Sequence, residues 1–213
     1  MKLADIIHKS LNSDIIPLDL LSCLLTNKTL NAKKALIKRA CQKGELIRVK
    51  NALYVVGDKQ RKYGINHFTI ANLMVMPSYV SLESALSYYN LIPETVYTTT
   101  SVTLNLTQEY PSPLGQFSFS HLKENYFNHG FYQATLGTHH FLIATPLKAL
   151  IDVLVVHHKK YEKIDDIIED LRFNWDEFKN LKEFVTPTKV LELKKIYRSN
   201  RMLKILTSIE KNL

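Results

Sequence analysis

The sequence is poor in the residues that mark fibrous, disordered or disulfide-linked proteins. Its 213 residues include only 6 glycines, 7 prolines and 2 cysteines. So few Gly and Pro residues exclude a collagen-like or low-complexity chain, and 46% hydrophobic residues supply enough apolar surface for a packed core. The composition therefore predicts one or two globular domains.

Cysteine clusters and long apolar runs are also missing. Cys23 and Cys41 lie in no CxxC pattern and beside no Cys/His cluster, so we expect two small apolar residues of a reducing compartment rather than a disulfide framework or a zinc site. No apolar run approaches about 18 residues, and no apolar signal region follows the N-terminus. We therefore expect no membrane partner and predict a cytoplasmic protein.

Patterns typical of catalysis are absent from the sequence as well. It contains no Gly-rich phosphate loop, nucleophile elbow or metalloprotease pattern. The histidine pairs at 139–140 and 157–158 predict no metal site, because neighbours on a strand face opposite ways and imidazoles at a helix end complement its carbonyl dipole. We expect a protein that is not an enzyme and needs no cofactor or metal. An enzyme acting on nucleic acid would need a carboxylate or metal cluster that the sequence does not show.

Positive charge is present in excess, and it is concentrated in one segment. The chain carries 28 Lys and Arg against 20 Asp and Glu, a formal net charge of +8. Residues 1–62 hold 13 of the basic and 5 of the acidic side chains, whereas residues 63–213 hold 15 of each. The segment 1–62 therefore predicts a polyanionic partner such as DNA, with a merely solvated lysine surface as the alternative.

Three helices are predicted in this basic segment. Apolar spacing predicts the first over 2–11, and Pro17 suits the first position of the second, which continues to Leu25. The third is expected to follow Asn31 as its N-cap and to end before Gly44, which accepts a positive φ.

A hairpin is predicted directly after the third helix. The period changes to two, which predicts strands over 45–49 and 52–56 joined at Lys50-Asn51, where Asn51 takes the positive φ. Three helices followed by a hairpin is the order of a winged helix-turn-helix, which places its third helix in the major groove of DNA and its wing on the backbone or the minor groove.

Polar side chains of the third helix and the wing form the predicted DNA-binding set. Ala32, Leu36 and Ala40 recur every four residues with Ala35 beside them, which predicts the inward side of the helix. The outer side and the wing then supply the DNA-binding residues, which we predict to be Lys28, Lys33, Lys34, Lys38, Gln42, Lys43, Arg48 and Lys50.

The remainder predicts an α+β fold in several parts. The expected domains are a winged helix-turn-helix over 1–58, a linker over 59–64, a mixed α/β domain over 65–158 and a helical region over 159–213. Helices are predicted over 65–76, 81–89 and 146–156. Strands of an antiparallel sheet are predicted over 98–103, 116–122, 131–134 and 139–144. Four tyrosines are expected to pack half-buried, with stacking on nucleic-acid bases as the alternative: Tyr88, Tyr89, Tyr97 and Tyr110.

Three stretches of the sequence resemble one family. Residues 77–94, PSYVSLESALSYYNLIPE, are similar to a characteristic segment of the AbiEi family, and Thr100 to Thr103 resemble the strand that follows it. Residues 144–152, ATPLKALID, resemble the family's "ATPEKALLD" helix start. The sequence departs from the family pattern at Leu147, where glutamate is usual, and at Asn90, where glycine is common.

The resemblance to AbiEi implies a transcriptional autorepressor that is also the antitoxin of a type IV toxin–antitoxin system in viral defence. Its winged helix would bind its own promoter, commonly at inverted repeats, as a dimer on double-stranded DNA. Its C-terminal part would neutralise a nucleotidyltransferase-like toxin encoded next to it. The alternative is a protein-interaction module that binds a toxin or another partner directly through its C-terminal region.

Overall fold

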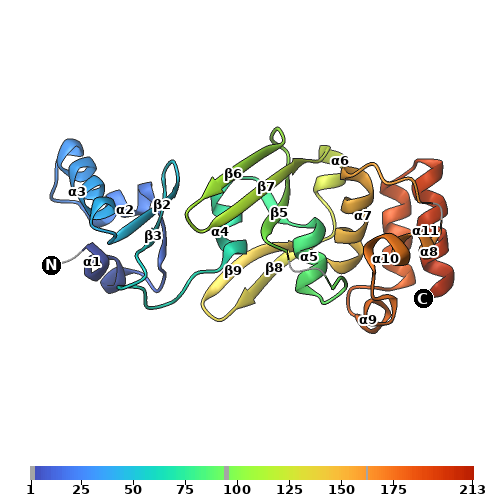
Figure 1. Ribbon diagram of the computed structural model, residues 1–213. Coiled ribbons are helices and arrows are strands. Elements are labelled where there is room, and N and C mark those ends of the chain that lie inside the picture. Colours follow the sequence, from blue (N-terminus) through green and yellow to red (C-terminus); the bar gives the residue numbers. More distant parts are fainter. Residues whose placement is uncertain (1–2, 94–95, 162) are drawn as a thin grey trace.

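The computed structural model describes residues 3–93, 96–161 and 163–213 and shows a mixed α+β protein. The elements form three groups in a row, with the N-terminal elements at one end, a six-stranded sheet in the middle and helices at the other end (Figure 1). Within the described residues, no helix has both the length and the apolarity needed to cross a membrane.

The N-terminal unit, residues 3–56, contains three helices and a small antiparallel sheet with the strand order β1-β3-β2. The first strand, β1, was not predicted, because three residues are too few to show an alternating pattern. The elements are α1 (Leu3–Ser10), β1 (Ile15–Pro17), α2 (Leu18–Leu24), α3 (Leu30–Gln42), β2 (Leu46–Lys50) and β3 (Leu53–Val56).

Three local details of the N-terminal unit differ from the predictions. The N-cap of α3 is Thr29, whose Oγ1 accepts a hydrogen bond from the Ala32 amide, so Asn31 lies inside the helix. Pro17 ends β1 and precedes α2, one position earlier than expected. In the turn between β2 and β3, the positive φ of 64° belongs to Ala52 rather than to Asn51.

The six-stranded sheet has the order β6-β7-β5-β4-β9-β8. It is mixed, with β5 parallel to β7 and β4 parallel to β9, so the prediction of a purely antiparallel sheet was wrong. Two strands that were not predicted take part in this arrangement: β6 pairs antiparallel with β7 at the edge, and β4 lies between β5 and β9. The strands are β4 (Ser78–Val80), β5 (Thr98–Thr103), β6 (Gln108–Ser112), β7 (Gly115–His121), β8 (Phe131–Leu136) and β9 (His139–Ala144).

Helices pack on both faces of this sheet. The register pairs Val102 with Tyr79 and Ser101 with Phe119, and consecutive residues of a strand point to opposite faces. Val102 and Tyr79 therefore face the layer of α5 (Leu82–Tyr88) and α7 (Pro146–Val156), whereas Phe119 packs with α4 (His67–Met74). The short helix α6 (Glu124–Phe127) precedes β8.

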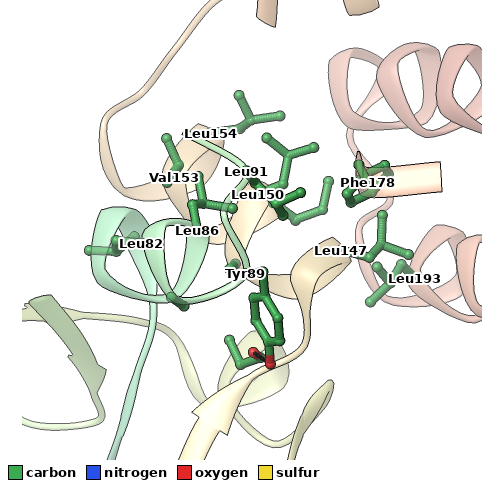
Figure 2. Close-up of a cluster of buried hydrophobic side chains, with 14 of the residues drawn as sticks. Leu82, Leu86, Tyr89, Leu91, Leu147, Leu150, Val153, Leu154, Phe178 and Leu193 are labelled. Carbon is green, nitrogen blue, oxygen red and sulfur yellow. Dashed lines mark hydrogen bonds between the residues drawn. The ribbon is translucent and has the colours of Figure 1, made fainter. Parts of the chain in front are cut away.

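The C-terminal helices share their core with the sheet. Leu193 of α10 and Phe178 of α9 lie beside Leu147 of α7, and the same cluster continues to α5 (Figure 2). One continuous group of buried side chains therefore joins the central sheet to the end of the chain. These helices are α8 (Ile164–Leu171), α9 (Trp175–Asn180), α10 (Pro187–Ile196) and α11 (Asn200–Asn212).

The N-terminal unit is attached to the central sheet by the segment 57–66 and by a shared apolar contact. Asp14 is fully buried, and its Oδ2 accepts hydrogen bonds from the backbone amides of Lys62, Tyr63 and Gly64. Its Oδ1 pairs with Nε2 of His8 at 2.7 Å. A second core then joins the three-stranded sheet to α4 and β7, and its buried residues are Ile15, Val49, Leu53, Val55, Ile70, Ala71, Met74, Val75, Phe117 and Phe119.

Candidate functional site

Side chains of α3 and β2 surround a hollow on the surface of the N-terminal unit. The volume of the hollow is about 550 Å³. Four of its lining residues belong to the predicted DNA-binding set, and we call these four the basic face: Lys34, Lys38, Gln42 and Arg48. The hollow is completed by Leu18, Ile37, Cys41 and Tyr54.

The orientation of α3 explains why these side chains are outside. Its buried residues are Ile37 and Ala40, which pack against α1, α2 and β2, while Lys34 and Lys38 are exposed. The prediction that Ala32 lies on the inward side was wrong, because Ala32 is exposed. Alanine buries little apolar area, so Ala32 in the first turn gains little from burial, while Ile37 and the partly buried Leu36 supply most of the packed surface of the helix.

Positive charge on the basic face is not neutralised by neighbours. The first turn of α3 carries no acidic residue, and among the described residues no ion pair involves Lys34 or Lys38. Arg48 is exposed and donates a hydrogen bond to Oδ1 of Asn51 in the wing turn. A surface of this kind attracts anions, and it can contact phosphates without first breaking an internal ion pair.

Cys41 lies at the floor of this hollow, half-buried. Burial raises the pKa of its thiol, although the nearby Arg48 acts in the opposite direction. The side chain therefore stays a protonated thiol at neutral pH, which agrees with an apolar packing role.

Lys33 does not belong to the outer surface. It is half-buried, and its ammonium donates a hydrogen bond of 2.8 Å to the carbonyl oxygen of Ser22 in α2. The expectation that all the lysines of α3 point outward was therefore wrong at this position. Lys33 lies on the side of the helix near Ile37 and Ala40, and its long stem spans the gap to α2.

Lys50 is also turned away from the wing surface. Its ammonium donates a hydrogen bond of 2.7 Å to the carbonyl of Met74 at the end of α4, and it lies 4.1 Å from the ring centroid of Tyr110. The cause is a register shift between Arg48 and Lys50 in the β2–β3 ladder, and such a bulge redirects the side chain that follows it. The prediction of a phosphate contact at Lys50 is thereby corrected, since this lysine joins the N-terminal unit to the central sheet.

Other predicted residues remain at the margins of the basic face. Lys28 lies before α3 and Lys43 is its C-cap, and both are exposed. Tyr110, for which base stacking was the alternative, packs edge-on against Phe119 and under Lys50.

Two residues that the sequence reasoning missed are exposed in the first turn of α3. Leu30 has 65% of its surface exposed, and Asn31 is exposed beside it. The N-cap of α3 was predicted at Asn31, but Thr29 is the N-cap and accepts the hydrogen bond from the Ala32 amide. The pair Thr29 and Asn31 are both good capping residues, so local sequence does not decide between them.

A buried ionic cluster lies beside the central sheet, and its two charged side chains come from α7. Lys148 and Asp152 of α7 are both fully buried and form an ion pair. The other carboxylate oxygen of Asp152 accepts hydrogen bonds from Ser81 Oγ at 2.8 Å and from Tyr79 OH at 3.3 Å. Ser81 is the N-cap residue of α5, but its hydroxyl donates to Asp152 and makes no capping hydrogen bond, and Oγ1 of Thr100 accepts the bond from the Ser84 amide instead.

Burial shapes the acid–base behaviour of this cluster. Burial raises the pKa of Asp152 and lowers the pKa of Lys148. The charge of each partner and the hydrogen bond between them act in the opposite direction on both pKa values. Burial and the Asp152 charge together raise the pKa of Tyr79, which remains a phenol. The arrangement stabilises the contact of β4, α5 and α7, and none of its charges reaches the surface.

The histidine pairs lie in ordinary structural surroundings. His157 donates from Nε2 to Oε1 of Glu83 at 2.8 Å, and Nδ1 of His140 lies 2.9 Å from the hydroxyl of Thr135. In the part of the chain that the structure describes, no three His, Cys, Asp or Glu side chains come together as metal ligands.

Comparison with known protein families and with curated proteins gave no match to this chain.

Proposed function

We propose that this protein is a DNA-binding transcriptional regulator whose N-terminal unit is a winged helix-turn-helix. The observation that carries the proposal is the basic face, where cations from α3 and from β2 line one hollow. In this arrangement α3 enters the major groove of double-stranded DNA, and Arg48 reaches the adjacent phosphates from the wing.

The position of α3 favours this mode of binding. The helix lies at the free end of the molecule, and the central sheet packs on the opposite side of the N-terminal unit (Figure 1). Because Lys50 and the apolar residues of the small sheet are covered by α4 and β7, the outer side of α3 is the surface left for a large partner.

The antitoxin part of the proposal rests on the resemblance to the AbiEi family. We propose that the regulator represses its own promoter and counteracts a nucleotidyltransferase-like toxin of a type IV system. Two of the three resembling stretches, 77–94 and 144–152, contain β4, α5 and most of α7, which pack together around Asp152. Both stretches therefore contribute to the same packed contact. This supports the family proposal without identifying a toxin.

A mobility-shift titration with the promoter duplex of the chain's own gene tests DNA binding. The double variant Lys34→Ala plus Lys38→Ala should weaken binding to all duplexes and lower the slope of log K against log salt by about 0.9 for each lost phosphate contact. The matched control is Lys182→Ala plus Lys195→Ala, which removes the same charge from two exposed positions of the C-terminal region, one in the turn before α10 and one in α10.

The two variants separate a local contact from a general charge effect. If both change the affinity and the salt slope equally, α3 is not the binding element. If wild-type protein binds no duplex at low salt, the proposal of a DNA-binding regulator fails.

The alternative is a protein-interaction module in the C-terminal region. One observation favours it, an apolar hollow of about 660 Å³ between α4 and the β8–β9 hairpin, at whose edge Met76 is 72% exposed. Co-purification with the product of the neighbouring gene at 0.5 M salt would support this alternative, since apolar contacts survive salt and phosphate contacts do not.

A further inference from the structure

The first turn of α3 presents two side chains that the fold does not use. Leu30 is 65% exposed and belongs to none of the buried clusters of the described residues. The side-chain amide of Asn31 is exposed and makes no hydrogen bond within the described chain. Replacing either side chain by alanine should therefore leave the fold intact, so the two positions are suitable for a functional test.

Leu30 and Asn31 lie on the same side of α3 as the basic face. With about 100° between successive residues of a helix, Leu30 is about 40° to one side of Lys34 and Asn31 about 60° to the other. Lys38 and Gln42 follow Lys34 along the same stripe. The helix thus presents, from its N-terminal end, an apolar group, an amide, and then cations.

This order of side chains fits the division of labour on a DNA surface. Lysines and arginines contact phosphates and carry little sequence information, whereas contacts to base edges specify sequence. In the major groove an asparagine amide pairs with N6 and N7 of adenine, and an apolar side chain contacts the methyl group of thymine. Recognition helices reach base edges with their N-terminal residues.

We propose that Leu30 and Asn31 read A·T base pairs in the major groove, with Asn31 bonded to an adenine and Leu30 against a thymine methyl. This inference rests on the proposed DNA-binding function and adds the class of sequence that is recognised. Lys34 and Lys38 then supply affinity, and the first turn of the helix supplies specificity.

The test is selection from a library of double-stranded DNA with a random 20-base-pair core, using the full chain. Wild-type protein should enrich a site with A·T pairs at fixed positions. Asn31→Ala should lose the preference for adenine at one position, with affinity for the wild-type site reduced about 5- to 150-fold and affinity for an unrelated duplex unchanged. Leu30→Ala should relax the preference for thymine at a neighbouring position.

Two matched variants complete the experiment. Leu191→Ala truncates a leucine that is 48% exposed on α10 and should leave the selected site unchanged. Lys34→Ala should weaken binding to selected and unrelated duplexes alike. Thermal melting followed by circular dichroism should give the wild-type transition for Leu30→Ala and Asn31→Ala.

The outcomes distinguish this inference from the proposed function. If wild-type protein enriches a site and both first-turn variants enrich the same site with the same affinity, base reading by Leu30 and Asn31 is refuted while DNA binding stands. If the variants lose selected and unrelated DNA equally, these residues act on affinity alone and the inference again fails. If wild-type protein enriches nothing and retains no duplex, the proposed function itself is wrong.

Discussion

At the scale of single residues, the most demanding interaction is the ion pair between Lys148 and Asp152. Both side chains are fully buried, and the carboxylate also accepts hydrogen bonds from Ser81 and Tyr79. Two buried charges tolerate one another because each offsets the desolvation of the other, so removing only one leaves an uncompensated charge in the core.

Lys148→Met should therefore lower the free energy of unfolding by about 3–5 kcal/mol, because Asp152 loses its counter-charge. The double variant Lys148→Met plus Asp152→Asn should recover most of that loss, since the neutral amide oxygen still accepts from Ser81. Urea unfolding followed by fluorescence of Trp175 measures both. A single variant as stable as the wild type would show that the pair is not ionised in the folded protein.

The pair of His157 and Glu83 should make stability depend on pH. The hydrogen bond to Glu83 raises the pKa of His157. Burial alone would raise the pKa of Glu83, but the hydrogen bond from His157, a backbone hydrogen bond and nearby positive charge together lower it. The histidine contribution is therefore complete below the unfolded pKa of about 6.5 and is lost as pH rises through the folded value. The glutamate contribution is present above its unfolded pKa and is lost as pH falls through the folded one.

Melting temperatures measured between pH 5 and pH 8.5 should fall toward the alkaline end for the wild type and less so for Glu83→Gln. The same substitution should lower the pKa of His157 in a nuclear magnetic resonance titration. An unchanged titration curve would mean that the two side chains do not interact in solution.

At the scale of elements, the junction of α3 with the β2–β3 hairpin depends on two glycines. Gly44 has a φ of +67° and ends the helix, while Gly57 lies so close that a Cβ there would be 1.9 Å from the carbonyl oxygen of Gly44. The Gly57 amide also donates to the carbonyl of Glu45. The end of β3 is thus packed directly against the end of the recognition helix proposed above.

Gly57→Ala should destabilise the protein by about 1–3 kcal/mol, because backbone must move to admit the methyl group. Gly137→Ala is the control, since Gly137 lies in a turn with a φ of +61° and a Cβ added there would meet open space. Its cost should be limited to the backbone strain of about 1 kcal/mol that a positive φ imposes on alanine. Chemical unfolding of both variants compares the two effects, and equal losses would contradict the close contact at Gly57.

Elements whose signals are local could be predicted, and those that depend on distant partners could not. The helix Pro146–Val156 was predicted with its observed bounds, because Thr145 and Pro146 mark its start and its apolar run is long. The strand Gln108–Ser112 was missed because it contains Pro111 and is stabilised by pairing at the sheet edge. In the candidate site, Lys34 and Lys38 were placed correctly by helical spacing, whereas Lys33 and Lys50 were not, since their orientations depend on Ser22 and on a bulge beside α4.

At the scale of the whole molecule, Asp14 holds the N-terminal unit to the segment that leads into the sheet. One carboxylate oxygen receives three successive backbone amides, and the other contacts His8. Hydrogen bonds to a charged acceptor contribute about 1.5–3 kcal/mol each, so the three together fix the path of a segment that composition alone marks as a loop.

Asp14→Ala should therefore loosen residues 58–64 and lower stability by at least about 3 kcal/mol. Limited trypsin digestion should cut this variant faster at Arg61 and Lys62 than the wild type. Asp58→Ala provides the control, because Asp58 is an exposed residue of the same segment and pairs only with Arg61 at the surface. Equal digestion of the two variants would contradict the anchoring role of Asp14.

The placement of the charged unit at one end of an elongated molecule makes the protein an electric dipole. The positive end contains α3, and the rest of the molecule, residues 63–213, carries equal numbers of basic and acidic side chains (Figure 1). In the field of the proposed DNA partner such a dipole would rotate before contact, so that most encounters would begin with the α3 end foremost. This orientation raises the association rate, whereas the dissociation rate depends on the contacts within the bound complex. Added salt should therefore slow association more than it speeds dissociation.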